Sequence, residues 1–297
     1  MHTTLGTALS YGNNMTKFDT EADFDAHCRA QESTIIRYVD KNHSGFQQLD
    51  NDTLGQLSPR ETKYSYANNF GSRIRFTQDL LNEVERYVAE YKVKDIRFVT
   101  LTPAVFATTE GDATEFDVEA IKSWVRDHLP GHDYFGIVEA AYYPAWPDGR
   151  VTISWHVHLF AFEMTYRRFL EQKAAINASH HSLVPGVEAA VSESVAISNF
   201  TYKVRYMLKY PTYRYRPSQI TVKAPPSSER ATRIPTGRYY LNKDDLRPGE
   251  LVRMCRILAH LGLDDLLFAA GSGEAIIAPV VHRATAAIRY DEDRRHF

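Results

Sequence analysis

The sequence predicts an α+β fold in which helices cover an antiparallel sheet. Stretches with helical spacing of apolar residues alternate along the chain with β-branched stretches of period two. A strong turn signal, Pro147-Asp148-Gly149, separates two of the β-type stretches and predicts a hairpin. The order of strand, helix, hairpin and helix fits a split β-α-β palm with further helices at both ends of the chain.

The first elements follow from local patterns. Residues 1–60 are polar and rich in Asn and Asp, and we expect one helix there, over 20–39. Apolar residues recur at i, i+3, i+4 and i+7 over 77–93, which is typical of an amphipathic helix. Residues 96–102 alternate and are β-branched, so they predict a strand, which Pro103 ends.

The same criteria place the later elements. Pro130-Gly131 ends one helix, and Pro211 stops another that carries a pair of tyrosines. The remaining expected elements are helices over 116–129, 165–176, 198–210 and 251–263, and strands over 134–143, 151–162, 216–223 and 238–241.

The composition excludes several classes of protein. The chain has 297 residues, is 43% hydrophobic and 24% charged, and contains no apolar run of the length that a membrane helix needs. Its first residues lack the pattern of a secretory signal. Cys28 and Cys255 lie far apart, which argues against a disulfide framework or a structural zinc site. We therefore expect a cytoplasmic protein that does not engage a membrane.

Charge is unevenly distributed along the chain. The formal net charge is −2, yet residues 201–256 hold 13 Lys and Arg against 4 Asp and Glu, a local balance of +9. A basic stretch of this kind is what contact with a phosphate backbone needs, although a solvated basic face would look the same. The candidate DNA-binding residues in this stretch are Lys203, Arg205, Arg214, Arg216 and Lys223.

Two histidines predict a metal site. His156 and His158 are separated by one residue on the expected strand 151–162, so both side chains project from the same face. Two imidazoles can share a divalent ion and leave it open to oxygen ligands. Glu139 is the candidate third ligand, because the predicted hairpin brings its strand alongside and because a carboxylate in an apolar run needs a partner.

The pattern His156-x-His158-x4-Glu163 also matches part of the metal motif of cupin barrels, which bind small molecules. The glycines expected around that motif are displaced or absent here, and the residues after Glu163 favour a helix. A cupin-like metal enzyme remains an alternative function.

The expected helix over 198–210 presents a candidate nucleophile. Tyr202 and Tyr206 lie four residues apart and share a face, with Lys209 three residues after Tyr206. A phenol has a pKa of about 10 and is a poor nucleophile at neutral pH. A metal that polarises a phosphate and an ammonium beside the phenol would both favour attack, which would leave a covalent phosphotyrosine. Alternatively, these side chains simply pack.

In these motifs the chain resembles the HUH endonuclease superfamily, and specifically the two-tyrosine replication initiators of rolling-circle plasmids and phages. Three motifs occur in the family's order: Phe98 to Thr102, with Thr100 and Thr102 as supporting residues; His156-Val157-His158; and Tyr202-xxx-Tyr206-xx-Lys209. Glu139 matches the acidic metal ligand that these proteins often carry.

The resemblance covers roughly residues 95–225. It implies a five-stranded antiparallel sheet of the ferredoxin or RRM type, Mg²⁺ or Mn²⁺ at the histidines, and single-stranded or hairpin origin DNA as substrate. The expected reaction is nicking and joining through a 5′-phosphotyrosine, in a bacterial or archaeal host cell. A non-catalytic DNA-binding protein on the same palm is a further alternative.

The resemblance also implies a division of the chain. We expect an N-terminal arm over 1–76, an endonuclease domain over 77–225 and a helical extension over 226–297. The two flanks match no part of the family, and the overall acidity is unusual for it. The sequence contains no GxxxxGK[ST] motif, so a helicase, like the polymerase, would come from the host.

Overall fold

Two long antiparallel strands form the centre of the sheet. In the computed structural model, which describes residues 18–42, 49–57, 66–223 and 233–295, β3 (Asp133–Tyr143) pairs with β4 (Thr152–Phe162) along its whole length. The register runs from Asp133 opposite Phe162 to Tyr143 opposite Thr152. The hairpin predicted from Pro147-Asp148-Gly149 is therefore confirmed.

In the described part of the chain the sheet has eight strands, and the expected five-stranded antiparallel palm is wrong. The strand order is β5-β1-β4-β3-β6-β7, with β2 added to β4 and β8 added to β3. The contact between β3 and β6 is parallel, at Tyr142 opposite Arg214, so the sheet is mixed. The other strands are β1 (Ile96–Leu101), β2 (Ala107–Thr109), β5 (Ala190–Ser194), β6 (Tyr213–Lys223), β7 (Arg233–Asp245) and β8 (Leu267–Ala270).

Helices occupy most of the predicted helical stretches. The boundaries are α1 (Glu21–Lys41), α3 (Asn51–Gln56), α4 (Phe70–Tyr91), α5 (Val118–His128), α6 (Tyr166–Ser179), α7 (Phe200–Leu208), α8 (Pro248–Leu258), α9 (Leu263–Leu266) and α10 (Glu274–Arg295). Short 3-10 turns lie at η1 (Ala104–Phe106), η2 (Asp112–Glu115), η3 (Ile197–Asn199) and η4 (Gly271–Gly273). The helix expected over 251–263 begins earlier and is split into α8 and α9.

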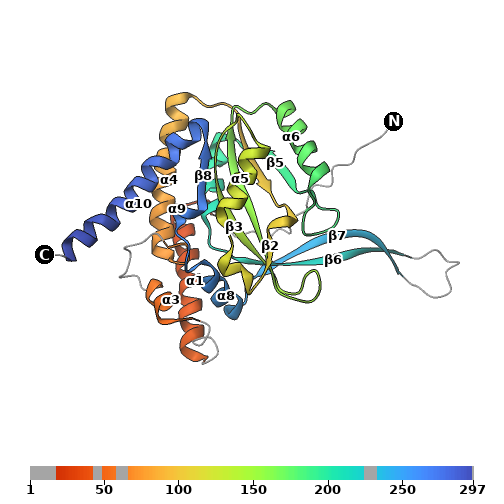
Figure 1. Cartoon of the computed structure of the whole chain (residues 1–297), viewed down its shortest axis with the longest axis horizontal. Coiled ribbons are helices and arrows are strands. Elements are labelled where there is room, and N and C mark those ends of the chain that lie inside the picture. The colour runs from red at the N-terminus through yellow and green to blue at the C-terminus, as the bar shows by residue number, and fades with distance from the viewer. Residues whose placement is uncertain (1–17, 43–48, 58–65, 224–232, 296–297) are drawn as a thin grey trace.

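Both faces of the central strands are buried. Side chains alternate along β4, and Phe160 and Phe162 contact Phe200 of α7 and Tyr87 of α4, with ring centroids 4.5 and 5.1 Å apart. On the opposite face, Trp155 stacks on Phe116, just before α5, at 4.6 Å. The sheet is thus enclosed between α4 with α7 on one side and α5 on the other, and Figure 1 shows helices on both sides of β3.

The flanking segments share the core of the central part. A single buried apolar cluster contains Phe18 and Ile35 near the N-terminus, Leu159 in β4, and Ile276 and Val280 in α10. The expected boundary between 76 and 77 falls inside α4. The expected boundary between 225 and 226, like residues 1–17 of the expected arm, lies outside the described residues.

Candidate metal centre and tyrosine

Strand register brings three candidate ligands together. Glu139 of β3 lies directly opposite His156 of β4, and His158 lies two residues further along the same face. On its other side β4 pairs with β1, where Thr100 lies opposite His158. The polar cluster therefore sits in the middle of the sheet, under α7, where its geometry is set by three adjacent strands.

The ligand atoms converge on one point. Glu139 Oε2 lies 3.2 Å from His158 Nε2 and 3.8 Å from His156 Nε2, and all three ligand atoms lie within 4.8 Å of one another. The side chains are 8 to 9% exposed. Among the described residues, no group donates a hydrogen bond to Glu139 Oε2, although the atom is buried. A buried acceptor of this kind beside two imidazole nitrogens fits a cation, and the triad can hold a metal ion.

Neighbouring groups orient both imidazoles for that purpose. His156 Nδ1 lies 3.2 Å from the carbonyl oxygen of Ser154, which can only accept, so Nδ1 carries the proton. His158 Nδ1 lies 2.9 Å from the Thr100 hydroxyl oxygen, which can either accept or donate a hydrogen bond. The neutral His156 ring then presents an unprotonated Nε2 to the cluster, and the His158 ring does the same when Thr100 accepts, as in metal-binding histidines.

The protonation states also suit a cation. Burial lowers the pKa of His156 to about 4, with a further contribution from His158, and burial lowers the pKa of His158 as well. Burial alone would raise the pKa of Glu139, but the Lys209 ammonium and the two imidazoles together hold it well below its usual range. At neutral pH the cluster is one carboxylate with two neutral imidazoles.

Lys209 contacts both the candidate metal ligands and Tyr206. It lies just beyond the end of α7 and is buried, and its ammonium donates to Glu139 Oε1, whereas the histidines approach Oε2. The same ammonium lies 4.3 Å from the ring centroid of Tyr206. The sequence placed Lys209 beside Tyr206 but gave no sign of its ion pair with Glu139.

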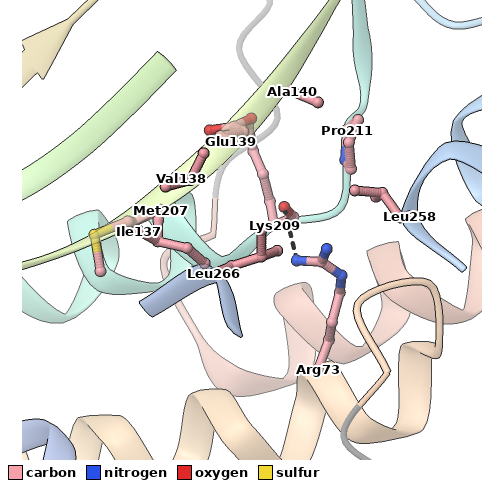
Figure 2. A pocket seen from close by; sticks show the side chains of 10 residues that line it. All are labelled: Arg73, Ile137, Val138, Glu139, Ala140, Met207, Lys209, Pro211, Leu258 and Leu266. Atoms are coloured by element: carbon pink, nitrogen blue, oxygen red, sulfur yellow. Dashed lines mark hydrogen bonds and ion pairs between the residues drawn. The ribbon is translucent and has the colours of Figure 1, made fainter. Parts of the chain in front are cut away.

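Arg73, which sequence reasoning missed, supports this junction from α4. Its guanidinium donates to the carbonyl oxygens of Leu208 and Lys209, at 2.9 and 3.3 Å, and to that of Ala67 at 2.8 Å. Figure 2 shows Arg73 extending toward the backbone of Lys209, in a pocket that Glu139 also lines. Arg73 therefore caps the C-terminal end of α7, where carbonyl groups carry partial negative charge.

Of the two candidate nucleophiles, Tyr206 is the one beside the metal ligands. Its half-buried ring lies 5.7 Å from the His158 ring and 6.3 Å from Phe98. Three ammonium groups surround it, since Lys243 and Lys203 lie 5.7 and 5.8 Å from the ring centroid in addition to Lys209.

Tyr202 lies one turn earlier on α7. It packs against the core, and burial raises its pKa. The Lys203 ammonium lies 6.0 Å from its ring centroid. The helix therefore points both phenols to the same side, as predicted, but only Tyr206 contacts a histidine of the cluster among the described ring contacts.

The candidate DNA-binding cations have different surroundings. Lys203 pairs with Glu193, and Arg205 donates to the carbonyl oxygens of Phe18 and Asp19. Arg214 is buried and pairs with Glu250, whereas Arg216 is exposed and bonds Asp244 at 2.5 Å. Lys223 is exposed at the far end of β6.

Two other predicted residues lie outside the cluster. The backbone N–H of Thr102 donates a hydrogen bond to the carbonyl oxygen of Ala189. Glu163, the third ligand of the cupin-like alternative, is exposed and accepts a bond from the backbone nitrogen of Lys94 at 2.9 Å. The triad that could hold a metal ion is thus the one of the Glu139 prediction.

Lys243 is the second functional candidate that the sequence did not single out. It lies on β7, and burial lowers its pKa to about 8, with Lys209 adding to the effect. Its ammonium lies 3.7 Å from the Tyr213 ring centroid as well as near Tyr206. In the sequence it stands in a polar stretch, Asn242-Lys243-Asp244-Asp245, which resembles any solvated strand end.

The chain matches no protein-family model, no curated protein and no solved structure. Within the described residues, every helix is too short or too polar to cross a bilayer.

Proposed function

We propose that this chain nicks and rejoins single-stranded DNA through a covalent bond to Tyr206, and that it does so with Mg²⁺ or Mn²⁺ at Glu139, His156 and His158. The observation that carries the proposal is the position of Tyr206 between a buried metal-ligand set and three ammonium groups. A phenol and a metal site at this distance suit attack on a phosphodiester. The three surrounding ammonium groups favour a substrate that carries phosphate charge over an uncharged small molecule.

In the proposed reaction the Tyr206 oxygen attacks phosphorus, the new O–P bond forms, and the bond from phosphorus to the 3′ oxygen breaks. The phenol gives up its proton and the departing 3′ oxygen takes one up, so the products are a 5′-phosphotyrosine and a free 3′ hydroxyl. A divalent ion, when bound, makes the phosphate more electrophilic. Lys209 and Lys203 favour the phenolate and offset charge on the phosphate oxygens.

His156 holds its unprotonated Nε2 toward the cluster, and Thr100 orients His158, which presents an unprotonated Nε2 when the Thr100 hydroxyl accepts. Lys209 holds Glu139 in its ionised form. Reversal of the same step by the 3′ hydroxyl would rejoin the strand, because the bond energy is conserved in the phosphotyrosine. Tyr202 is proposed as a second nucleophile or a helper. Initiation of rolling-circle replication with a host helicase and polymerase is the biological role we propose.

The test is a denaturing gel with a diverse pool of labelled single-stranded oligonucleotides, in Mn²⁺ and in EDTA. We expect a metal-dependent protein–DNA band that survives denaturant and disappears in His156→Ala and Tyr206→Phe. Tyr91→Phe, which alters an exposed tyrosine at the end of α4, is the matched control and should keep the band.

An undiminished band in Tyr206→Phe would overturn the assignment of the nucleophile, and loss only in Tyr202→Phe would exchange the two roles. DNA binding with no adduct in any metal would instead favour a non-catalytic DNA-binding protein.

A further inference from the structure

The strands β6 and β7 continue beyond the body of the protein as a two-stranded ribbon. They contain 11 and 13 residues, and at about 3.3 Å per residue the ribbon is about 35 Å long. Figure 1 shows the ribbon extending away from the helices and the rest of the sheet. We define its outer part as residues 216–223 and 233–241.

The base of the ribbon belongs to the proposed site. Tyr215 packs on a small cluster around Tyr143 of β3, and Lys243 approaches Tyr206. Tyr239 and Leu241, at the inner end of the outer part, pack on the same cluster. The strand β6 begins only a few residues after Lys209. A molecule held along the ribbon would therefore end at the tyrosine.

The outer ribbon is basic and has no acidic residue of its own. It carries Arg216, Lys223, Arg233 and Arg238, and neither Asp nor Glu occurs in its two ranges. Lys223 lies directly opposite Arg233 in the register. Two like charges in facing positions destabilise a free ribbon, and a polyanion lying along it would remove that repulsion.

Apolar side chains accompany these cations. Val222 and Ile234 face each other across the strands and are 51% and 39% exposed, and Tyr240 is 51% exposed. Exposed edge strands often carry charged residues that limit pairing with other chains, whereas here apolar side chains stand beside the charges. Apolar groups beside cations suit base edges and sugars next to phosphates, since a thymine methyl is read by apolar contact.

We infer that the outer ribbon binds duplex DNA adjoining the single strand at Tyr206. The major groove of B-form DNA is about 12 Å wide and admits a two-stranded β-ribbon, whereas the major groove of an RNA duplex is too deep and narrow. The ribbon would hold a duplex stem while its base presents the unpaired strand. The link to cleavage rests on the proposed function, but duplex binding does not.

The binding test measures fluorescence anisotropy of a labelled DNA duplex with the full-length Tyr206→Phe protein, which cannot cut. In that background we compare the ribbon variant Lys223→Glu/Arg233→Glu/Arg238→Glu with a control, Arg86→Glu/Lys94→Glu/Arg167→Glu, which makes the same charge change at exposed sites elsewhere. We expect duplex affinity to fall at least about tenfold in the ribbon variant and less than about threefold in the control. The slope of log K against the logarithm of the salt concentration should become less negative by about 2 to 3 in the ribbon variant only.

Equal losses in the two variants, or unchanged affinity in the ribbon variant, would overturn the inference. Equal affinity for an RNA duplex would overturn the groove assignment. A dimer in sedimentation velocity that only the ribbon variant dissociates would assign the ribbon to a second copy of the chain instead.

A second measurement separates this inference from the proposed function. With Tyr206 intact, the ribbon variant should still form the covalent adduct on a fully single-stranded substrate but lose it on the same site flanked by a hairpin stem. If the wild-type protein forms no adduct at all, the proposed function fails while the anisotropy result stands by itself.

Discussion

The Lys209 ammonium lies buried against Glu139, the carboxylate that also faces His156 and His158. One cation thus offsets the charge of the only acidic residue in the described metal-ligand set and lies 4.3 Å from the ring centroid of Tyr206. The ligand set and the tyrosine are therefore coupled through a single side chain.

Replacing Lys209 with Met should destabilise the protein. Breaking a buried ion pair by removing one partner leaves an uncompensated charge, and the expected loss in the free energy of unfolding is about 3 kcal/mol in EDTA. Mn²⁺ should restore part of it by compensating Glu139. Urea denaturation with and without Mn²⁺ measures both effects. An equal loss under the two conditions would contradict the coupling.

Mn²⁺ should stabilise the wild-type protein against heat. A ligand at about 100 times its Kd adds about 2.7 kcal/mol, which corresponds to a rise of several degrees in Tm for a chain of this size. Glu139→Gln should abolish the rise, and Glu163→Gln should retain it, because Glu163 is exposed and bonds Lys94 instead. The reverse result would favour the cupin-like ligand set.

Thr100→Val should weaken metal binding without removing a ligand. The hydroxyl oxygen lies 2.9 Å from His158 Nδ1, and loss of such an orienting partner typically costs about 10- to 100-fold in affinity. Thr102→Val is the matched control, since Thr102 contributes a backbone bond that the substitution keeps. Titration calorimetry with Mn²⁺ measures the difference, and equal affinities in the two variants would argue against an orienting role for Thr100.

His27 should make stability depend on pH. Burial, with a smaller effect of Lys209, lowers its pKa from 6.5 to about 4, so between these values the unfolded chain binds the proton more tightly. The stability that neutral His27 contributes is complete above pH 6.5 and is lost as the pH falls to about 4. The upper bound on this contribution is about 3 kcal/mol.

The measurement is the free energy of unfolding of the wild type and of His27→Asn between pH 4 and pH 7. The difference between the two proteins should change across this window. His181→Asn, at an exposed position, is the control and should keep the wild-type slope. Parallel curves for the wild type and His27→Asn would contradict the prediction.

Local patterns predicted the centre of the site well. The turn at Pro147-Asp148-Gly149 predicted correctly that the strand of Glu139 lies beside the strand of His156 and His158. The connection over residues 144–151 is too long to fix the register, so the position of Glu139 opposite His156 follows from the structure. Helical spacing likewise predicted that Tyr202 and Tyr206 share a face.

The number of strands could not be predicted from these local patterns. The strands β2, β5 and β8 have 3, 5 and 4 residues, too few for a period to be visible, and their pairing with distant strands determines that they are extended. Arg73 and Lys243 were missed for a related reason. Each reaches the site from an element distant in the sequence, and nothing in its neighbours distinguishes it from a solvated cation.

The cap that Arg73 places on α7 has a mechanical consequence for the proposed reaction. A DNA strand joined to Tyr206 would be anchored to α7, and tension on that strand would pass through the Leu208 and Lys209 carbonyl groups to Arg73. Part of the load would thus pass to the 22-residue helix α4, and the rest to Glu139 of β3 through the ion pair of Lys209. Arg73 would therefore reduce the share of the tension that reaches the candidate metal ligands.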